Sequence, residues 1–196
     1  TTKNEALGYV GKITKVRAKP ILDLQNFLIQ RNDWLYERVV GWTADMDLPA
    51  WLVDVKSTDW YFKPVMWAVE NGITSGTGDK TFSPYMSCTR AQVVTFLWRA
   101  AGSPEPVSDD NPFEDVKETD FFYKAVLWAV EEGITNGVDA THFGPNASCN
   151  RAQVVTFLWR AADCPEPAST EHPFVDVQSG SFYEKAVIWA VEQGIT

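Results

Sequence analysis

Residues Thr89–Ala101 have the sequence TRAQVVTFLWRAA, and residues Asn150–Ala162 have the sequence NRAQVVTFLWRAA. The two stretches differ only at their first residue and lie 61 positions apart in the chain. A long identity at a fixed offset is the signature of tandem structural repeats. We therefore expect a repeat fold with units of this length.

Each stretch predicts a buried helix that starts with a capping box. Thr89 and Asn150 are favourable N-cap residues, and Gln92 and Gln153 stand three positions later, where a side chain can return a hydrogen bond to the cap. Good helix formers and apolar side chains follow, and they cover more than one narrow stripe of the helix surface. A helix of this kind must be buried on most of its sides.

Arg90 and Arg151 directly follow the two caps. A cation in the first turn of a helix opposes the macrodipole. The same cation becomes favourable when an anion also binds, because free N–H groups, the positive helix end and a guanidinium can together hold a carboxylate or a phosphate. These two arginines are therefore the first candidate binding residues. Arg99 and Arg160 close the same helices, where a cation suits the dipole, and we interpret them as structural.

Shorter motifs recur along the chain with the same offset. They are Asp-Val at Asp54, Asp115 and Asp176, a tryptophan at Trp67, Trp128 and Trp189, and Gly-Ile-Thr at Gly72, Gly133 and Gly194. Each tryptophan lies in a predicted helix, and each glycine is a natural residue to end that helix in the left-handed region. The pattern predicts one repeat at 51–109, a second at 110–170 and the front half of a third at 171–196. We interpret the sequence as part of a longer protein.

These motifs, taken in this register, resemble the S-layer homology domain. The similarity rests on Phe113-x-Asp115-Val116, Phe122-Tyr123, Trp128-Ala129, Gly133-Ile134-Thr135-x-Gly137, Phe143-x-Pro145 and Asn150-Arg151-Ala152-Gln153. It covers about residues 51 to 196. The family's usual capped motif ends in Glu, whereas this chain has Gln at both places, and a third copy of that motif is absent from the sequence.

The resemblance implies a mainly α fold of tandem helix–loop–helix repeats, in which three copies form a pseudo-threefold helical bundle. It also implies a function without catalysis: non-covalent anchoring of a surface protein to a secondary cell-wall polysaccharide, commonly through pyruvate ketal groups. The expected location is extracellular, at a bacterial cell wall or S-layer of the Gram-positive type. The oligomeric state is left open.

The resemblance further implies grooves between neighbouring repeats. One pocket would combine Arg90 with Thr135 and Asn136 and with the segment from Asn146 to Ser148. A second would use Arg151 with Thr196 and with the missing sequence of the third unit. The equivalent loop residues of the first repeat are Thr74 and Ser75. Hydroxyl and amide side chains suit sugar hydroxyls, although they suit tight turns equally well. Supporting residues are Thr89, Asn150, Gln92, Gln153, Trp67 and Trp128, for which capping and packing are the commoner roles.

The composition limits the possible partners. The chain has 196 residues, is 45% hydrophobic and carries a net charge of −9, without a basic run. This balance argues against nucleic acid as a partner. No stretch has the ~18 uncharged apolar residues of a membrane span, and the first residues are not a signal peptide. An acidic protein that binds an acidic polymer must do so through local positive groups, which the capped arginines would supply.

We expect no cofactor, metal or catalytic residue. Cys88, Cys149 and Cys164 are predicted to be buried free thiols, because the sequence has no CxxC or Cys/His cluster. His142 and His172 are isolated, and no stretch matches a calcium-binding loop. Identical repetition of the Asp-Val aspartate suits a structural turn better than an asymmetric acid/base pair.

Two other functions remain open from the sequence. The chain could be the anchor of a surface enzyme whose catalytic domain lies elsewhere in the protein. It could also be a protein-interaction or host-contact module whose sugar site has decayed.

Residues 1–50 do not carry the repeat. We interpret them as the end of an upstream domain with a linker. As an alternative, the segment Ile13–Ala18 and a following helix at 20–30 would fill the place of the missing helix in the third unit.

Overall fold

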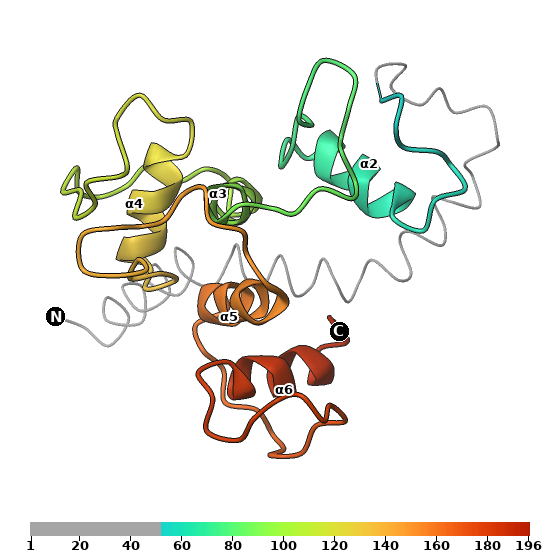
Figure 1. Ribbon diagram of the computed structural model, residues 1–196, viewed down its shortest axis with the longest axis vertical. Helices are drawn as coiled ribbons and strands as arrows, with labels where there is room; N and C mark the ends of the chain where they lie inside the picture. Colours follow the sequence, from blue (N-terminus) through green and yellow to red (C-terminus); the bar gives the residue numbers. More distant parts are fainter. Residues whose placement is uncertain (1–51) are drawn as a thin grey trace, which may run out of the picture. The chain divides into compact units, whose positions relative to one another are not determined.

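The structure, a computed structural model, describes residues 52–196, so the expectations for residues 1–50 lie outside the described part. Within the described part the chain forms five helices and two isolated β-bridges, without a β-strand (Figure 1). The helices are α2 (Phe62–Glu70), α3 (Arg90–Ala100), α4 (Tyr123–Glu131), α5 (Arg151–Ala161) and α6 (Glu184–Glu192). The prediction of a mainly α repeat fold is confirmed. The pseudo-threefold arrangement stays a prediction.

The helices are of two kinds that alternate along the chain. α2, α4 and α6 have nine residues each and follow an aromatic cluster, whereas α3 and α5 have eleven residues and follow a cap. Each nine-residue helix ends in the same way, with a glycine of positive φ just after the C-cap residue. The φ values are 67° at Gly72, 68° at Gly133 and 65° at Gly194. The predicted helix ends are therefore confirmed.

Both predicted capping boxes are present. In α5 the Asn150 side chain accepts from the Gln153 N–H at 2.9 Å, and the Gln153 side chain accepts from the Asn150 N–H at 3.0 Å. Thr89 and Gln92 exchange the same two bonds at 3.3 Å and 2.8 Å. Such reciprocal bonds satisfy N–H groups that the helix itself leaves without acceptors.

The chain divides into two compact units. The first contains α2 and includes the described residues 52–85 and 100–102, and the second contains residues 86–99 and 103–196. The boundary near residue 85 falls inside the first predicted repeat, and the predicted repeat boundaries stay predictions. The core of the described part of the first unit consists of Leu52, Val55 and Val65, packed against Tyr61, Phe62, Val69 and Phe82.

The core of the second unit forms around α4 and between α5 and α6. Five consecutive residues of α4, from Ala125 to Ala129, are buried, so this helix is covered on nearly all sides. α5 and α6 lie side by side (Figure 1) and bury Val155 against Ala186, Trp189 and Ala190. Burying apolar surface of this kind is the main favourable contribution to folding.

The tryptophans of the capped helices hold the linkers that follow them. The Trp98 indole donates to the Pro104 carbonyl at 2.8 Å, and the Trp159 indole donates to the Pro165 carbonyl at 2.9 Å. A partly buried indole N–H usually finds such a partner. Packing and linker attachment therefore account for these two residues.

Gly137 allows the loop before Phe143 to close. Its φ is 85°, and a Cβ atom built there would lie 2.6 Å from both the His142 carbonyl oxygen and the Phe113 ring. We expect Gly137→Ala to lower the free energy of unfolding by about 2–4 kcal/mol, because left-handed strain and overpacking act together. Gly133→Ala is the matched control: its φ is 68°, but nothing lies within 4 Å of the new methyl group, so only about 1–2 kcal/mol should be lost. Denaturant unfolding followed by circular dichroism measures both, and equal losses would contradict the close approach.

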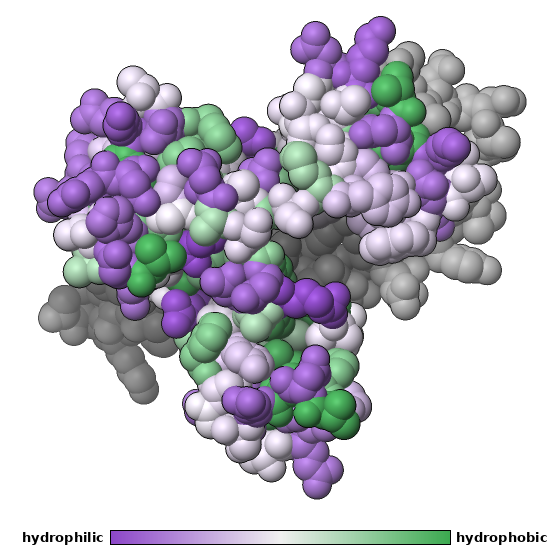
Figure 2. Space-filling model, in the orientation of Figure 1, coloured by the Kyte–Doolittle hydropathy of each residue, from purple (hydrophilic) through white to green (hydrophobic). Residues whose placement is uncertain are grey.

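The described surface carries several exposed large hydrophobic side chains. On the face drawn in Figure 2, hydrophobic residues form separate patches among hydrophilic ones. An exposed aromatic ring recurs at one repeat position, where Trp60, Phe121 and Phe182 are 86%, 66% and 64% exposed. Among residues 52–196, no helix combines the length and the apolar character that crossing a membrane requires.

Candidate functional site

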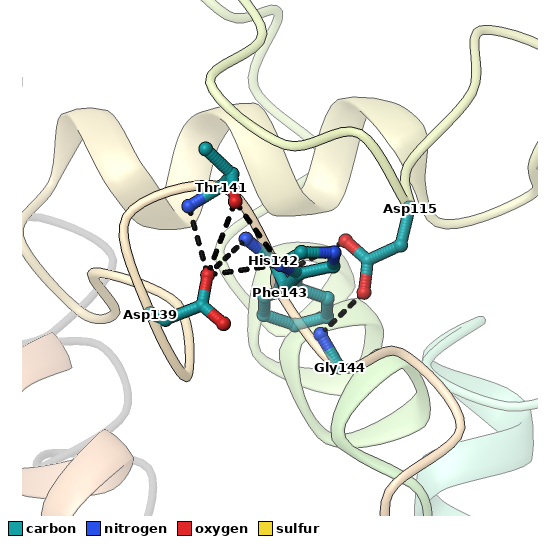
Figure 3. A network of polar contacts seen from close by, with 6 residues as sticks. All are labelled: Asp115, Asp139, Thr141, His142, Phe143 and Gly144. Atoms are coloured by element: carbon teal, nitrogen blue, oxygen red, sulfur yellow. Dashed lines mark hydrogen bonds and ion pairs between the residues drawn. The ribbon is translucent and has the colours of Figure 1, made fainter.

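The site is positioned by an aspartate that clamps the turn before each capped segment. The Asp115 carboxylate accepts from the N–H groups of Phe143 and Gly144, both at 2.8 Å (Figure 3). Asp54 makes the equivalent bonds in the first unit, to Phe82 at 2.9 Å and Ser83 at 2.7 Å. The predicted structural role of these aspartates therefore agrees with their contacts. In the second unit, the clamp fixes the direction of the Phe143 carbonyl.

Arg90 lies at the centre of this arrangement and is only 4% exposed. Its Nε donates to the Phe143 carbonyl at 3.0 Å, and one terminal nitrogen donates to the Thr135 hydroxyl at 3.3 Å. The guanidinium carbon also lies 5.0 Å from the ring centre of Phe143 and 5.2 Å from that of Phe157, a favourable arrangement for a cation. The sequence-predicted pairing of Arg90 with Thr135 is thus present in the structure.

The guanidinium of Arg90 is a buried cation without an anionic partner among residues 52–196, where no carboxylate forms an ion pair with it. Burial lowers its pKa, and nearby Cys149 and Asp115 oppose that shift. Arginine nevertheless keeps its proton in proteins. Its hydrogen bonds and the two aromatic rings offset part of the free-energy cost of desolvating the guanidinium, and an anion bound against the guanidinium would offset more of it.

Arg151 repeats the arrangement in a more open setting. It is exposed, and one terminal nitrogen donates to the Thr196 hydroxyl at 2.9 Å. In both pairs the threonine follows the arginine by 45 residues. The structure therefore brings together both arginine–threonine pairs that the sequence predicted.

The expectation of free N–H groups at the helix start is wrong for α3. Its first two N–H groups, on Arg90 and Ala91, donate to the carbonyls of Ala147 and Pro145 at 2.9 and 3.1 Å. The chain itself occupies this positive helix end, because the loop before α5 folds back onto it. An anion near α3 must therefore contact the guanidinium or the neighbouring side chains rather than the backbone.

Thr135 and Thr74, the predicted threonines that follow α4 and α2, are buried in turns. Thr135 is 1% exposed, and its hydroxyl accepts from the Gly137 N–H at 3.2 Å in addition to its bond with Arg90. Thr74 is 8% exposed and accepts from the Gly76 N–H at 3.1 Å. Both hydroxyls thus stabilise the loop that follows them, which is the alternative role that their residue type allows.

The other predicted polar residues lie on the surface. The exposed ones are Ser75, Asn136, Asn146 and Ser148. Ser148 lies opposite Thr89 in an isolated antiparallel bridge, and this bridge joins the segment before α3 to the segment before α5. Of the two supporting tryptophans, Trp128 is 9% exposed and belongs to the core, and Trp67 is partly buried.

Arg160 belongs to the site region, although we interpreted it from the sequence as a structural helix end. Its Nη1 donates to the Ile134 carbonyl at 3.2 Å. Two guanidinium groups therefore contact neighbouring residues, Ile134 and Thr135, in the same turn. The repeat alone could not show this contact, because it depends on how the folded chain brings α5 to the turn after α4.

The prediction of buried thiols is wrong. Cys88 and Cys164 are exposed and Cys149 is partly buried, and all three are free. In the described part of the chain, no group of three or more histidine, cysteine or acidic residues could hold a metal ion.

A second polar network closes the loop between Thr135 and Phe143. One oxygen of Asp139 accepts from the N–H groups of Thr141 and His142 at 2.9 and 2.8 Å, and it lies 3.0 Å from the His142 ring nitrogen (Figure 3). The first repeat has Gly78 and Thr81 at the positions of Asp139 and His142. The first repeat therefore lacks this network.

We expect this loop to respond to pH in two ranges. The hydrogen bond between the His142 ring and the Asp139 carboxylate, which accepts it, raises the pKa of His142. The hydrogen bond from the Thr141 N–H, together with His142, lowers the pKa of Asp139. The raised pKa of His142 contributes stability below the unfolded histidine value of about 6.5, and this contribution is lost as the pH rises through the folded value. The lowered pKa of Asp139 contributes stability above the unfolded aspartate value of about 4, and this contribution is lost as the pH falls through the folded value. The loop should be most stable between these values. An NMR titration of His142 checks this, and Asp139→Asn should lower the histidine pKa; an unchanged titration in that variant would contradict the pairing.

Comparison with known proteins identifies the repeats. The S-layer homology domain family matches residues 53–94 and 112–155. These segments contain both Asp-Val clamps, α2, α4 and the starts of both capped helices. The chain therefore contains two matches to the S-layer homology domain, one in each of its first two repeats.

Several curated proteins are similar to part of the chain. An endoglucanase of Bacillus sp. (strain KSM-635) is 39% identical over 108 residues, which are 55% of this chain and 11% of that protein. The surface-layer 125 kDa protein of Lysinibacillus sphaericus is 34% identical over 90 residues, 46% of this chain and 8% of that protein. An amylopullulanase of Thermoanaerobacterium thermosulfurigenes is 31% identical over 111 residues, 54% of this chain and 6% of that protein. The chain thus spans only a small part of the length of each relative.

Proposed function

We propose that this chain anchors a larger protein to the outside of a bacterial cell by binding an anionic secondary cell-wall polysaccharide without a covalent bond. The two matches to the S-layer homology domain support cell-wall anchoring as the general role, and the relatives include a surface-layer protein. The recurrence of the arginine–threonine pair in both capped repeats carries the more specific proposal. The polymer is that of a Gram-positive type of wall, and its anionic group is a pyruvate ketal.

The chemistry of the pair suits such a group. A guanidinium offers several N–H donors in a plane that matches a carboxylate, and the adjacent hydroxyl can bind a sugar oxygen. Arg151 is exposed and can meet the carboxylate directly. Arg90 is almost fully buried, and the polymer would meet it beside the exposed Asn136 and Asn146, which lie next in sequence to residues that contact Arg90 or its helix.

The net charge makes a local cation necessary. At −9 the protein as a whole repels an acidic polymer. Screening weakens that long-range repulsion at physiological ionic strength, while a hydrogen-bonded contact between a guanidinium and a carboxylate is affected less. Binding should therefore depend on a few positions rather than on total charge.

Cosedimentation with purified cell walls tests the proposal. Walls that still carry their secondary polysaccharide should retain the chain, and walls from which that polymer has been extracted should not. Equal retention by both preparations would contradict polysaccharide binding and would favour an interaction with peptidoglycan or with wall protein.

A second proposal concerns the whole protein. Two relatives are named as enzymes, an endoglucanase and an amylopullulanase, and the matched segments are a small part of each. We propose that this chain is the non-catalytic anchor of its own protein, whose remaining domains carry any enzymatic activity. The sequence of the complete gene product tests this directly: a protein made only of anchor repeats would contradict a catalytic role for the remainder.

A further inference from the structure

The segments that lead into α3 and α5 bring two repeat-equivalent cysteines together. Cys88 and Cys149 each precede a helix cap, 61 positions apart in the sequence. The Cys149 N–H donates to the Cys88 carbonyl at 2.9 Å, and the Arg90 N–H donates to the Ala147 carbonyl at 2.9 Å. These two bonds flank the antiparallel bridge between Thr89 and Ser148, so the two cysteines are direct opposites in one short antiparallel pair.

The spacing of such a pair is close to that of a disulfide. Opposite residues in a hydrogen-bonded antiparallel pair have Cα atoms about 5.5 Å apart, with both side chains on one face. Disulfides have Cα separations of roughly 4.4–6.8 Å. The Cβ atoms of opposite residues, about 4.5–5.5 Å apart, must approach by about 1 Å to reach disulfide geometry. An isolated bridge between loops can make this adjustment more easily than a continuous sheet.

The two thiols also differ in solvent exposure. Cys88 is exposed, so a small oxidant can reach it, and Cys149 lies beside it and is partly buried. The atoms around the two sulfurs partly desolvate them and so raise the pKa of both thiols, although the Cys88 residue as a whole is exposed, and the Arg90 guanidinium opposes this effect at Cys149. Exposed Cys88 is therefore the natural first point of reaction, with Cys149 as the resolving thiol.

We propose that Cys88 and Cys149 form a disulfide between the two repeats when the protein meets a low-molecular-mass disulfide such as glutathione disulfide. The Cys88 thiolate attacks one sulfur of glutathione disulfide and releases one glutathione thiol. The Cys149 thiolate then attacks the Cys88 sulfur of the mixed disulfide and releases the second. The protein loses two electrons and two thiol protons, which appear in the two reduced glutathione molecules.

The cross-link would act on the fold and on the candidate binding region. It joins the start of α3, where Arg90 lies, to the loop that caps the first N–H groups of that helix. The closed loop contains α4 and the Asp115 clamp. Closing a loop of this length restricts the unfolded chain strongly, so the oxidised protein should be the more stable form.

Peptide mapping tests the proposal. The complete chain is incubated with glutathione disulfide, its remaining thiols are alkylated, and the digest is analysed by mass spectrometry. We expect one cross-linked peptide pair containing Cys88 and Cys149, with Cys164 alkylated, and a thermal midpoint roughly 10 °C above that of the reduced protein. Cys164→Ser is the matched control, since the first repeat has Ser103 at that position, and it should keep both the cross-link and the shift.

Cys88→Ser and Cys149→Ser should each abolish the cross-link and the thermal shift. Three outcomes would overturn the proposal. They are glutathione adducts on Cys88 and Cys149 without a cross-link, a disulfide that uses Cys164, and a Cys88–Cys149 bond that joins two chains, which non-reducing electrophoresis would detect as a dimer.

Discussion

Replacing Phe143 by alanine is expected to lower the free energy of unfolding of the second compact unit by about 3–5 kcal/mol, the usual loss for a fully buried aromatic side chain. The Phe143 side chain is 0% exposed, and its ring packs against Phe113 at 5.8 Å between ring centres. The ring also faces the guanidinium of Arg90. The variant therefore creates a cavity and removes the aromatic face that stabilises a buried cation.

Phe82→Ala is the matched control for this variant. Phe82 occupies the same repeat position and receives the same aspartate clamp, but it is only partly buried. Hydrogen exchange of α4, measured alongside denaturant unfolding, assigns the loss to the second unit. A loss below about 1 kcal/mol for Phe143→Ala, or equal losses for both variants, would show that the ring is not the centre of this core.

Loss of the two capped arginines should have the largest effect on binding. We expect Arg151→Gln to weaken the affinity for the wall polysaccharide by roughly 10- to 100-fold, because one charge-assisted hydrogen-bonded contact contributes about 1.5–3 kcal/mol. Arg151 is exposed, and among residues 52–196 its side chain makes one hydrogen bond, to Thr196. The substitution should therefore leave the fold unaffected. The double variant with Arg90→Gln should bind more weakly still.

The stability of the Arg90 variant needs a separate measurement. Removing this guanidinium leaves the buried Phe143 carbonyl without its donor, which costs about 1–3 kcal/mol in addition to any loss of binding. Lys124→Gln is the charge-matched control for both variants, because it removes one positive charge from an exposed ion pair with Glu105. Surface plasmon resonance on immobilised polymer measures all of them. Equal affinities for Arg151→Gln and Lys124→Gln would show that total charge, rather than the capped arginine, decides binding.

The features that repeat within the chain were the ones that sequence could predict. Both capping boxes, the glycine-ended helices and the structural aspartates follow from local chemistry at positions 61 residues apart. The pairing of Arg90 with Thr135 followed from the family resemblance. Each of these depends on residue type and spacing, which the sequence states directly.

Contacts between segments that are far apart in the sequence could not be predicted in the same way, because they form only when the chain folds back on itself. The loop before α5 occupies the first N–H groups of α3, and it also places Cys149 opposite Cys88. Arg160, in α5, donates a hydrogen bond to the Ile134 carbonyl in the turn after α4. No local pattern distinguishes an arginine or cysteine that meets another repeat from one that faces water, so these positions needed the tertiary structure.

The most direct test of the anchoring proposal is the affinity of the chain for one wall polysaccharide before and after removal of its pyruvate groups. Isothermal titration calorimetry at fixed salt concentration gives both values with the same protein. We expect the untreated polymer to bind at least about 10-fold more tightly, because a carboxylate held by a guanidinium contributes more than about 1.4 kcal/mol. Equal affinity for the two polymers would contradict the role of the arginine–threonine pairs as a site for an anionic sugar substituent.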